Sequence, residues 1–461
     1  MEKAVKMYPL TNAQKMHFFT VQNCPFKQVL NIGVSLTIEI DVDVDVLRES
    51  IYEAYEHFEC ARIRFSKAED GSTMQYIADE DKRFIPYFEF RHWKYEDAEN
   101  EMRKWTEIPF ERYDSPMNKI VIIAMPDGFQ GVYFCVDHMT MDAQALITFL
   151  SDIMMIYSRK KYNYAYKNPA TSYIKALEKD LAYENNSKAL QRDRKYWTEV
   201  IESSEPMFTD IMGTKLLDDQ RVAANNFKLR AAANANNSME AGIATFHLEP
   251  LPTAAIMRFC KENNVPVVCL LMMALRTYLQ KMNRNEPDIS IQSTVSRRAT
   301  LSEKTSGGTR VHFFPCRTIV ELDDTFLEGC RKIQENQITN FHHANFNPIE
   351  FMANRSKYYN LKGQSYEGLS LTYQPLSMRS DDIPADIRYK SNWYSNGVDA
   401  QALYLTVSHR ALDNGLDFSF EYKKCKYNYG DLEKLYYYLS KIIFEGITSP
   451  NKKVGAIIAA V

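Results

Sequence analysis

The stretch from Val132 to Tyr157 constrains the fold of this chain more than any other. In its first part Val132, Phe134 and Val136 recur at every second position, and this spacing is typical of a β-strand. In its second part, residues 144–157, apolar side chains recur at helical spacing. The sequence therefore predicts a strand, a short turn and a helix, both elements apolar enough to lie in a core.

The turn between these two elements carries one histidine and one carboxylate. His138 follows the strand directly, and Asp142 stands where the N-cap of the helix is expected. A strand end holds a histidine rigidly, as acid–base chemistry requires. A histidine beside an apolar strand is also commonly a structural residue, and an aspartate before a helix is commonly only a cap. The local pattern therefore leaves a catalytic and a structural interpretation open.

The composition indicates a folded protein with room for two domain-sized units. The 461 residues are 45% hydrophobic and 25% charged, and the formal net charge is -3. Because the basic residues are dispersed along the chain, no nucleic-acid partner is expected. The longest apolar run, residues 265–275, contains Pro266 and is much shorter than the roughly 20 residues that a membrane span requires. We expect a buried helix there and no membrane association.

The cysteines and histidines show no metal-binding pattern. The sequence has 8 cysteines and no CxxC pair, so neither zinc nor a disulfide framework is expected. His342 and His343 are adjacent but lack a third ligand at a useful spacing. No apolar signal peptide precedes Tyr8, and free cysteines suit a reducing compartment. These features predict a cytoplasmic protein without a metal.

The turn resembles the HHxxxDG motif of condensation domains of nonribosomal peptide synthetases, which belong to the chloramphenicol acetyltransferase-like acyltransferase superfamily. His138 matches the second, catalytic histidine of this motif, and Asp142 matches its aspartate. Asp137 stands in place of the first histidine and Ala143 in place of the glycine. The resemblance implies that His138 is catalytic and that Asp142 and Asp137 support the site structurally.

Further segments resemble the same family, and they follow one another in the family's order. Residues 8–14, 60–65, 307–317 and 341–348 resemble in turn its PLTPAQ, LRTRF, GxFxNTxPxR and HqdvPf segments. Within the first segment Thr11 is the predicted N-cap of a helix. The ordered set extends from Tyr8 to about residue 444 and is much more specific than the histidine motif alone.

Arg62 is the candidate partner of Asp142. In the family, the first arginine of the LRTRF segment typically pairs with the aspartate of the histidine motif. The implied ion pair suits a partly buried carboxylate, which needs a cation or several hydrogen-bond donors. Spacing alone favours a different interpretation, in which Arg62 and Arg64 lie on the exposed side of an edge strand.

Three further residues are candidates for a substrate channel. His312 replaces the family's asparagine in a segment that commonly lines the cleft between two lobes. Tyr373 and Gln374 end a predicted strand that resembles another segment of this interface. The resemblance thus places these side chains near the path of the substrates.

The resemblance implies an α/β fold with two chloramphenicol acetyltransferase-like lobes, each with a mixed sheet, that form a V-shaped pseudo-dimer. We expect the N-terminal lobe at residues 1–180 and the C-terminal lobe at residues 190–461. Residues 202–242 are rich in asparagine and lack apolar periodicity, which predicts a mobile linker or loop.

The implied activity is that of a freestanding condensation-type acyltransferase. It would move an acyl or aminoacyl group from a phosphopantetheine thioester, on a carrier protein or in coenzyme A, to an amine, and so form an amide. The phosphopantetheine thioester is a substrate, and no bound cofactor is expected. Two alternatives stay open: a non-catalytic scaffold that binds a carrier protein, suggested by Asp137 and Ala143, and a coenzyme A-dependent alcohol acyltransferase that would retain His138 and form an ester.

Overall fold

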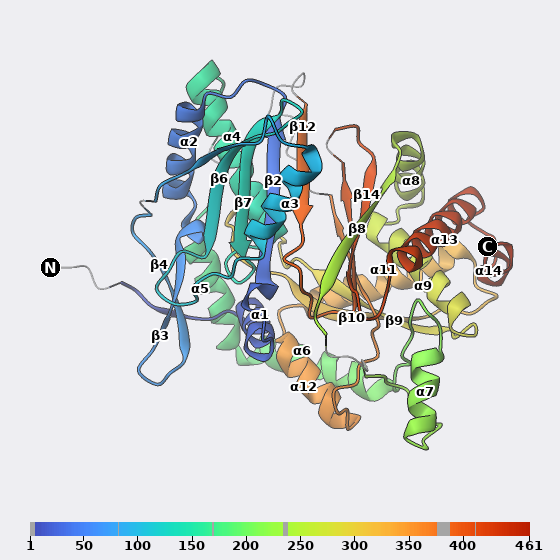
Figure 1. Ribbon diagram of the computed structural model, residues 1–461. Coiled ribbons are helices and arrows are strands. Elements are labelled where there is room, and N and C mark those ends of the chain that lie inside the picture. The colour runs from blue at the N-terminus through green and yellow to red at the C-terminus, as the bar shows by residue number, and fades with distance from the viewer. Residues whose placement is uncertain (1–4, 82, 168–169, 234–237, 376–387, 411) are drawn as a thin grey trace.

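The computed structural model describes residues 5–81, 83–167, 170–233, 238–375, 388–410 and 412–461. The chain forms two lobes that lie side by side, each built on a mixed β-sheet with helices packed against it (Figure 1). This arrangement is the predicted α/β fold with two lobes.

The N-terminal lobe is built on a sheet with the strand order β12-β2-β7-β6-β5, beside a smaller sheet of order β1-β4-β3. Its elements are β1 (Tyr8–Pro9), α1 (Asn12–Asn23), η1 (Lys27–Leu30), β2 (Asn31–Ile38), α2 (Val44–His57), η2 (Glu59–Arg62), β3 (Ile63–Lys67), β4 (Thr73–Ile77), β5 (Tyr87–Glu89), α3 (Tyr95–Thr106), β6 (Asn118–Ala124), β7 (Gln130–Asp137), α4 (Ala143–Tyr162) and α5 (Tyr173–Glu184).

Strand β7 lies in the middle of this sheet and is buried along its whole length. Val132, Phe134 and Val136 point to one face and pack in the core that α2 and α4 cover. Tyr133 and Cys135 point to the other face and pack in the core beneath α3. Apolar residues at both phases of the strand period explain why helices cover both faces of the sheet. The end of β7 is therefore held rigidly on two sides.

The C-terminal lobe is built on a sheet of order β10-β9-β11-β13-β14-β8, and its helices α8, α9, α11, α13 and α14 share one large apolar core with it. Its elements are α6 (Ser187–Ser203), α7 (Lys215–Ala223), β8 (Ala241–Leu248), α8 (Pro250–Asn263), α9 (Val267–Met282), β9 (Asp288–Val295), α10 (Leu301–Thr305), β10 (His312–Ile319), α11 (Phe326–His342), α12 (Pro348–Tyr358), β11 (Ser370–Gln374), β13 (Leu403–His409), β14 (Leu416–Lys423), α13 (Tyr429–Thr448) and α14 (Val454–Ala460).

One strand of the second half does not belong to the second lobe. β12 (Tyr389–Tyr394) pairs antiparallel with β2 and forms an edge of the N-terminal sheet, where it lies beside β2 in Figure 1. The Tyr394 hydroxyl lies 3.0 Å from the Ser35 hydroxyl, within hydrogen-bond distance. The predicted lobe boundary, which assigned all of residues 190–461 to the second lobe, is therefore wrong for this strand. No local pattern signals that a strand will pair across lobes.

Much of residues 202–242 is not the linker or loop that the sequence predicted, and the predicted mobility of the segment stays a prediction. Helix α6 continues to Ser203, α7 lies within the segment, and β8 begins at Ala241. Phe208, Leu217 and Ala232 are buried together in a small apolar cluster. The apolar residues are too far apart in sequence to show helical or strand periodicity, which is why the pattern suggested a loop. Residues 234–237 lie outside the described residues.

The predicted buried helix at residues 265–275 is confirmed as part of α9, whose central residues are enclosed by the C-terminal core. Among the described residues, no single helix is long and apolar enough to cross a membrane. Helices α8 and α9 meet such a length and composition test only together, and the pair is bent by 107°.

Candidate active site

His138 lies in a tight turn between β7 and α4, at the junction of the two lobes. The backbone N–H of His138 donates to Leu30 O over 2.8 Å, and the Thr140 N–H donates to Asp137 O over 2.9 Å. The Asp142 carboxylate accepts from the Ala145 N–H at 3.1 Å, so Asp142 is the N-cap of α4, as predicted. These bonds fix the turn at both ends and hold the histidine at one position.

The cation beside Asp142 is Arg298, and the predicted partner Arg62 is wrong. Arg298 Nη1 donates to Asp142 Oδ2 over 2.6 Å, and the backbone N–H of Arg310 donates to the same oxygen over 2.9 Å. Arg298 Nη2 donates to Gly308 O over 2.9 Å. Both donors come from the C-terminal lobe. The bonds to Asp142 therefore join the lobes directly behind the histidine turn.

Arg62 is occupied elsewhere in the N-terminal lobe. Its guanidinium donates to the backbone carbonyls of Tyr55, Glu56 and Ala78. The reason is local: Arg62 ends the short helix η2 before β3 begins, so its side chain does not follow the strand alternation that the sequence suggested. Arg64 is buried and pairs with Asp81 at 2.6 Å.

The charge on Asp142 is fixed by its neighbours. Burial by itself raises the pKa of this carboxyl, which is only 1% exposed. The Arg298 guanidinium and the backbone N–H donors outweigh burial, so the pKa of Asp142 lies below its ordinary value. Asp142 is thus ionised at neutral pH and has no proton to donate.

Asp137, the residue in place of the motif's first histidine, is a fully buried support of the turn. Its Oδ1 accepts from the Met139 N–H at 2.9 Å. Its Oδ2 lies 2.8 Å from Arg112 Nη1 in an ion pair. A carboxylate with a cation and a backbone donor stabilises the turn from within the N-terminal lobe.

The His138 imidazole is held neutral by its surroundings. Burial lowers the pKa of His138, while Asp142, Asp137 and a hydrogen bond to its own backbone carbonyl act in the opposite direction and leave the pKa below its ordinary value. The nitrogen nearest the backbone is Nδ1, which also lies 3.5 Å from the Thr309 hydroxyl. Among the described residues no hydrogen bond to Nε2 is found, so Nε2 is the nitrogen left to act on a substrate.

Sequence reasoning missed a second histidine at this site. The ring of His17, from α1, stacks on the ring of His138 with a centroid distance of 4.1 Å and an interplanar angle of 28°. His17 lies three positions after Gln14, whose side-chain amide donates to Met139 O over 3.3 Å. Because residues three apart share a helix face, the family-like Gln14 was the available signal that His17 faces the turn.

His312, a candidate for the substrate channel, is buried and its ring nitrogens are engaged. Its Nδ1 is 2.8 Å from Ala344 O, and its Nε2 is 3.1 Å from Arg297 Nη1. Burial, followed by the Arg297 charge, lowers the pKa of His312 well below its ordinary value. Its ring also interacts electrostatically with His17, and a substrate contact by His312 stays a prediction.

The other two channel candidates lie on β11, the strand between β9 and β13. The Tyr373 hydroxyl is 2.6 Å from His409 Nε2, and both Tyr373 and Gln374 are half-buried. Within the described part of the chain, no hydrogen bond joins either residue to His138. The structure therefore brings together His138, Asp142 and Asp137, while a substrate contact by these two residues stays a prediction.

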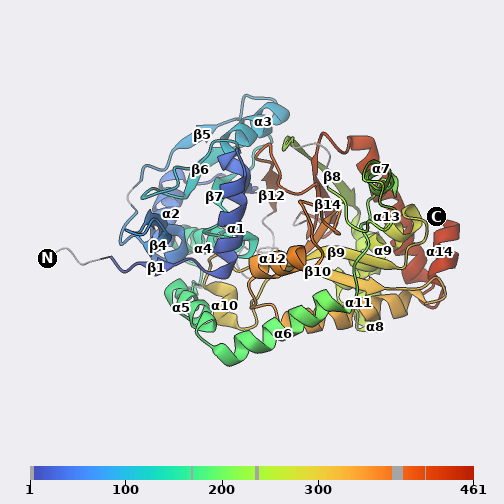
Figure 2. The same cartoon turned by 90° about the horizontal axis from the view of Figure 1, so that it is seen from below.

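An ion-pair network surrounds the Asp142 contact on its outer side. Arg297 and Arg310 both donate to Asp180 of α5, over 3.0 Å and 3.1 Å. These residues and Arg298 line a hollow of about 670 Å³ between α5, α6 and the loop after β9. Figure 2 shows α5, α6 and α10 along this lower side of the molecule. The network fixes the loop that carries Arg298.

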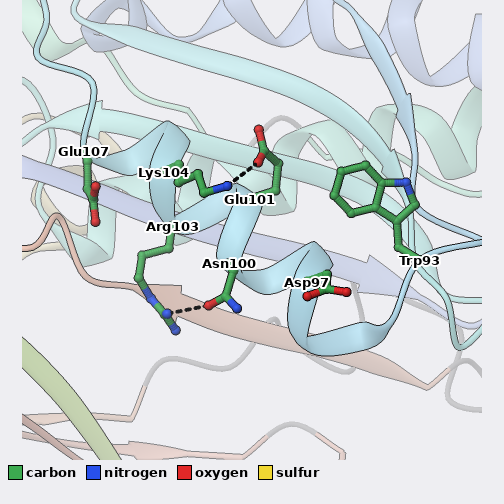
Figure 3. Close-up of a pocket in the computed structure, with 7 residues that line it drawn as sticks. All are labelled: Trp93, Asp97, Asn100, Glu101, Arg103, Lys104 and Glu107. Carbon is green, nitrogen blue, oxygen red and sulfur yellow. Dashed lines mark hydrogen bonds and ion pairs between the residues drawn. The ribbon is translucent and has the colours of Figure 1, made fainter.

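A second hollow, of about 560 Å³, lies on the outer surface of α3 and is not part of this site. Figure 3 shows its lining residues, with Arg103 directed at Asn100 and Lys104 at Glu101. Because these polar side chains pair within their own helix, the hollow offers a substrate few free groups.

Comparison with known proteins assigns the family. The family model of the condensation domain matches residues 4–459. The chain belongs to the condensation domain family. Surfactin synthase subunit 1 of Bacillus subtilis (strain 168) is 20% identical to this condensation domain over an alignment of 465 residues. The alignment covers 98% of this chain and 12% of that protein. The chain therefore spans about an eighth of the curated relative that it matches.

Solved structures show the same fold. The first condensation domain of the calcium-dependent antibiotic synthetase, in complex with substrate analogue 3a, superposes with a TM-score of 0.79 at 16% identity, over 98% of this condensation domain and 99% of that chain. The starter condensation domain of rhizomide synthetase RzmA in complex with C8-CoA gives a TM-score of 0.80 at 16% identity, over 98% and 97% of the two chains. The X-domain from teicoplanin biosynthesis, in a complex with OxyB, gives 0.71 at 16% identity, over 99% and 97%.

Proposed function

We propose that this condensation domain is an acyltransferase that forms an amide from a phosphopantetheine thioester and an amine. The observation that carries the proposal is His138, an imidazole that burial keeps neutral and that is fixed at the junction of the lobes. Its Nε2 has no hydrogen-bond partner among the described residues. Asp142 caps α4 and Asp137 pairs with Arg112, and these contacts hold the turn that carries the imidazole.

The proposed reaction requires the transfer of one proton, and His138 is placed to carry out this transfer. The amine nitrogen attacks the thioester carbon, the carbon–nitrogen bond forms and the carbon–sulfur bond breaks. His138 Nε2 accepts the proton that the amine loses and returns it to the leaving sulfur. Alignment of two bound reactants accounts for roughly 7 to 11 kcal/mol in favourable cases, and a placed imidazole adds about 10² to 10⁴-fold.

The donor is proposed to be an acyl group on a carrier protein or on coenzyme A. A starter condensation domain of the same fold is known in complex with C8-CoA, and surfactin synthase subunit 1 is a synthase subunit in which a matching domain occupies a small part. Both sources present the same thioester and the same pantetheine arm, so one site can accept either of them.

A scaffold without catalytic activity is the second candidate. Asp137 fills the place of the first motif histidine and is locked in an ion pair with Arg112, and the X-domain, which has this fold, is known in a complex with OxyB. This candidate predicts binding of a carrier or another protein without turnover.

A substrate panel distinguishes these candidates. The protein is incubated with octanoyl-coenzyme A or with an octanoyl-loaded carrier protein and a panel of amines and alcohols, and products are detected by mass spectrometry against a His138→Ala control. We expect an amide above the control. An ester alone would instead indicate the alcohol acyltransferase, and carrier binding without any product would favour the scaffold.

A further inference from the structure

His17 lies in face-to-face contact with the proposed catalytic ring. The two ring centroids are 4.1 Å apart at an interplanar angle of 28°. This geometry excludes an in-plane hydrogen bond between the rings, so His17 does not relay a proton to His138. It offers a flat surface against which the His138 ring can rest.

Helix α1 holds His17 firmly in this place. Thr11 and Gln14 form a capping box that fixes the start of the helix. The Gln14 amide also exchanges hydrogen bonds with the Gln75 amide, over 2.7 Å and 2.6 Å, and donates to Met139 O within the histidine turn. Gln14 and His17 therefore lie on the same face of α1, and Gln14 binds this face to the histidine turn about one helical turn before His17.

The other ring contacts of His138 are weak by comparison. Nδ1 is 3.5 Å from the Thr309 hydroxyl, at the outer limit of a hydrogen bond. The imidazole also has a hydrogen bond to the residue's own backbone. Among the described residues, these two contacts hold the edge of the imidazole, and the ring of His17 contacts its face.

The surroundings lower the pKa of His17 further than that of His138. Burial lowers the pKa of His138, and Asp142 from the start of α4 and Asp137 from the end of β7 partly offset this effect. Burial, and then a charge on His138, lower the pKa of His17 well below its ordinary value. His312, from β10, is held neutral beside Arg297 and adds no negative charge. Two rings 4.1 Å apart do not both become cations in a buried site.

We propose that His17 is a positioning residue, which fixes the ring plane of His138 by stacking and stays uncharged while His138 carries the proton. The proposal rests on the acyltransferase function given above. His17 is 5% exposed and, among the described residues, its Nε2 has no hydrogen-bond partner. A buried unpaired nitrogen lowers stability, so the chain gains no stability from the polar Nε2 of this imidazole. The flat ring against His138 is what the residue contributes.

Two substitutions of His17 distinguish the effect of an aromatic face from the effect of the imidazole nitrogens. His17→Phe retains an aromatic face, whereas His17→Leu fills the space without one. We expect His17→Phe to keep kcat within about twofold of the parent and His17→Leu to lower kcat by at least about 10-fold, with KM unchanged in both, because only orientation is lost. Both variants should melt at or above the parent temperature, since the unpaired nitrogen is removed.

A histidine-selective NMR titration tests the stacking without any turnover. In the parent, the ring protons of His138 should show ring-current shifts, which persist in His17→Phe and collapse in His17→Leu, and His17 should stay neutral throughout the titration of His138. A parent without turnover would refute the proposed function, while these shifts still decide the role of His17.

His343→Leu is the matched control, because the His343 ring stacks on Tyr196 at 4.0 Å, outside the site. It should change stability and leave kcat unchanged. The proposal is overturned if His17→Leu keeps full kcat, if His17→Phe loses as much kcat as His17→Leu, or if His17 takes up a proton together with His138.

Discussion

Asp142 is held by a guanidinium that lies 156 positions further along the chain. Its role as N-cap of α4 could be predicted, because a cap and its helix are neighbours in sequence. Its ionic partner could not: Arg62 fitted the family pattern, but Arg298 reaches Asp142 from the loop after β9 of the other lobe. The same limit hid His17, whose contact with His138 depends on how α1 packs on the turn. The roles of residues that are neighbours in sequence could be predicted at this site. The partners that come from distant parts of the chain could be identified only from the structure.

The Asp142 pair leads to a double-mutant prediction. Asp142→Ala should lower the free energy of unfolding by about 3 to 5 kcal/mol, because Arg298 is left buried and unpaired. Asp142→Ala combined with Arg298→Met should cost clearly less than the sum of the single changes. Chemical denaturation measures these values. Arg62→Met is the matched control, and a coupling of Asp142 to Arg62 in place of Arg298 would contradict the structure.

The same pair gives stability a pH dependence. The pKa of Asp142 is lower in the folded state than its ordinary value, with burial opposing and Arg298 and the N–H donors lowering it. Its contribution is therefore complete above the ordinary carboxyl pKa of about 3.9 and is lost as the pH falls towards the folded-state pKa. Melting curves between about pH 2 and pH 5 should show a smaller acid loss in Asp142→Ala than in the parent. An equal loss in both proteins would show that Asp142 does not contribute to the pH dependence of stability.

The sequence predicted the strands and helices whose apolar residues recur with strong periodicity. It did not predict the structure of two segments. β7 and α4 match the predicted strand and helix around His138. β12 has an ordinary strand pattern that carries no information on which sheet it joins, and it pairs with β2 of the first lobe. Residues 208–232 gave no periodic signal because their buried side chains are widely spaced.

The buried cluster changes what limited proteolysis should show. Because Phe208, Leu217 and Ala232 are enclosed, cleavage within residues 208–232 requires local unfolding and should be slow. Hydrogen exchange followed by mass spectrometry should find protected amides in α7. Leu217→Ala should raise both exchange and cleavage in this segment, whereas Val222→Ala, at an exposed position of the same helix, should not. Rapid cleavage of the parent there would support the original linker expectation.

At the scale of the whole molecule, several contacts join the two lobes, and two of them lie beside the histidine turn or in the sheet that carries it. One is the contact of Arg298 and the Arg310 N–H with Asp142, and the other is the pairing of β12 with β2. Figures 1 and 2 agree that the lobes lie side by side, with α1 of the first lobe close to α12 of the second. His138 therefore lies where residues of both lobes meet, a position that suits the proposed reaction of two separately bound substrates.

The proposed function depends on His138, which acts as a neutral base or positioning group in acyl transfer. The most direct test is the pH dependence of kcat/KM for amide formation from the best donor and amine of the panel, measured for the parent and for His138→Ala. Because burial lowers the pKa of His138, the parent rate, expressed per concentration of unprotonated amine, should rise with pH through a value below the ordinary histidine pKa of about 6.5 and then level off. His138→Ala should stay folded, lose this dependence and react at least about 10²-fold more slowly. An unchanged rate and pH profile in His138→Ala would contradict the account.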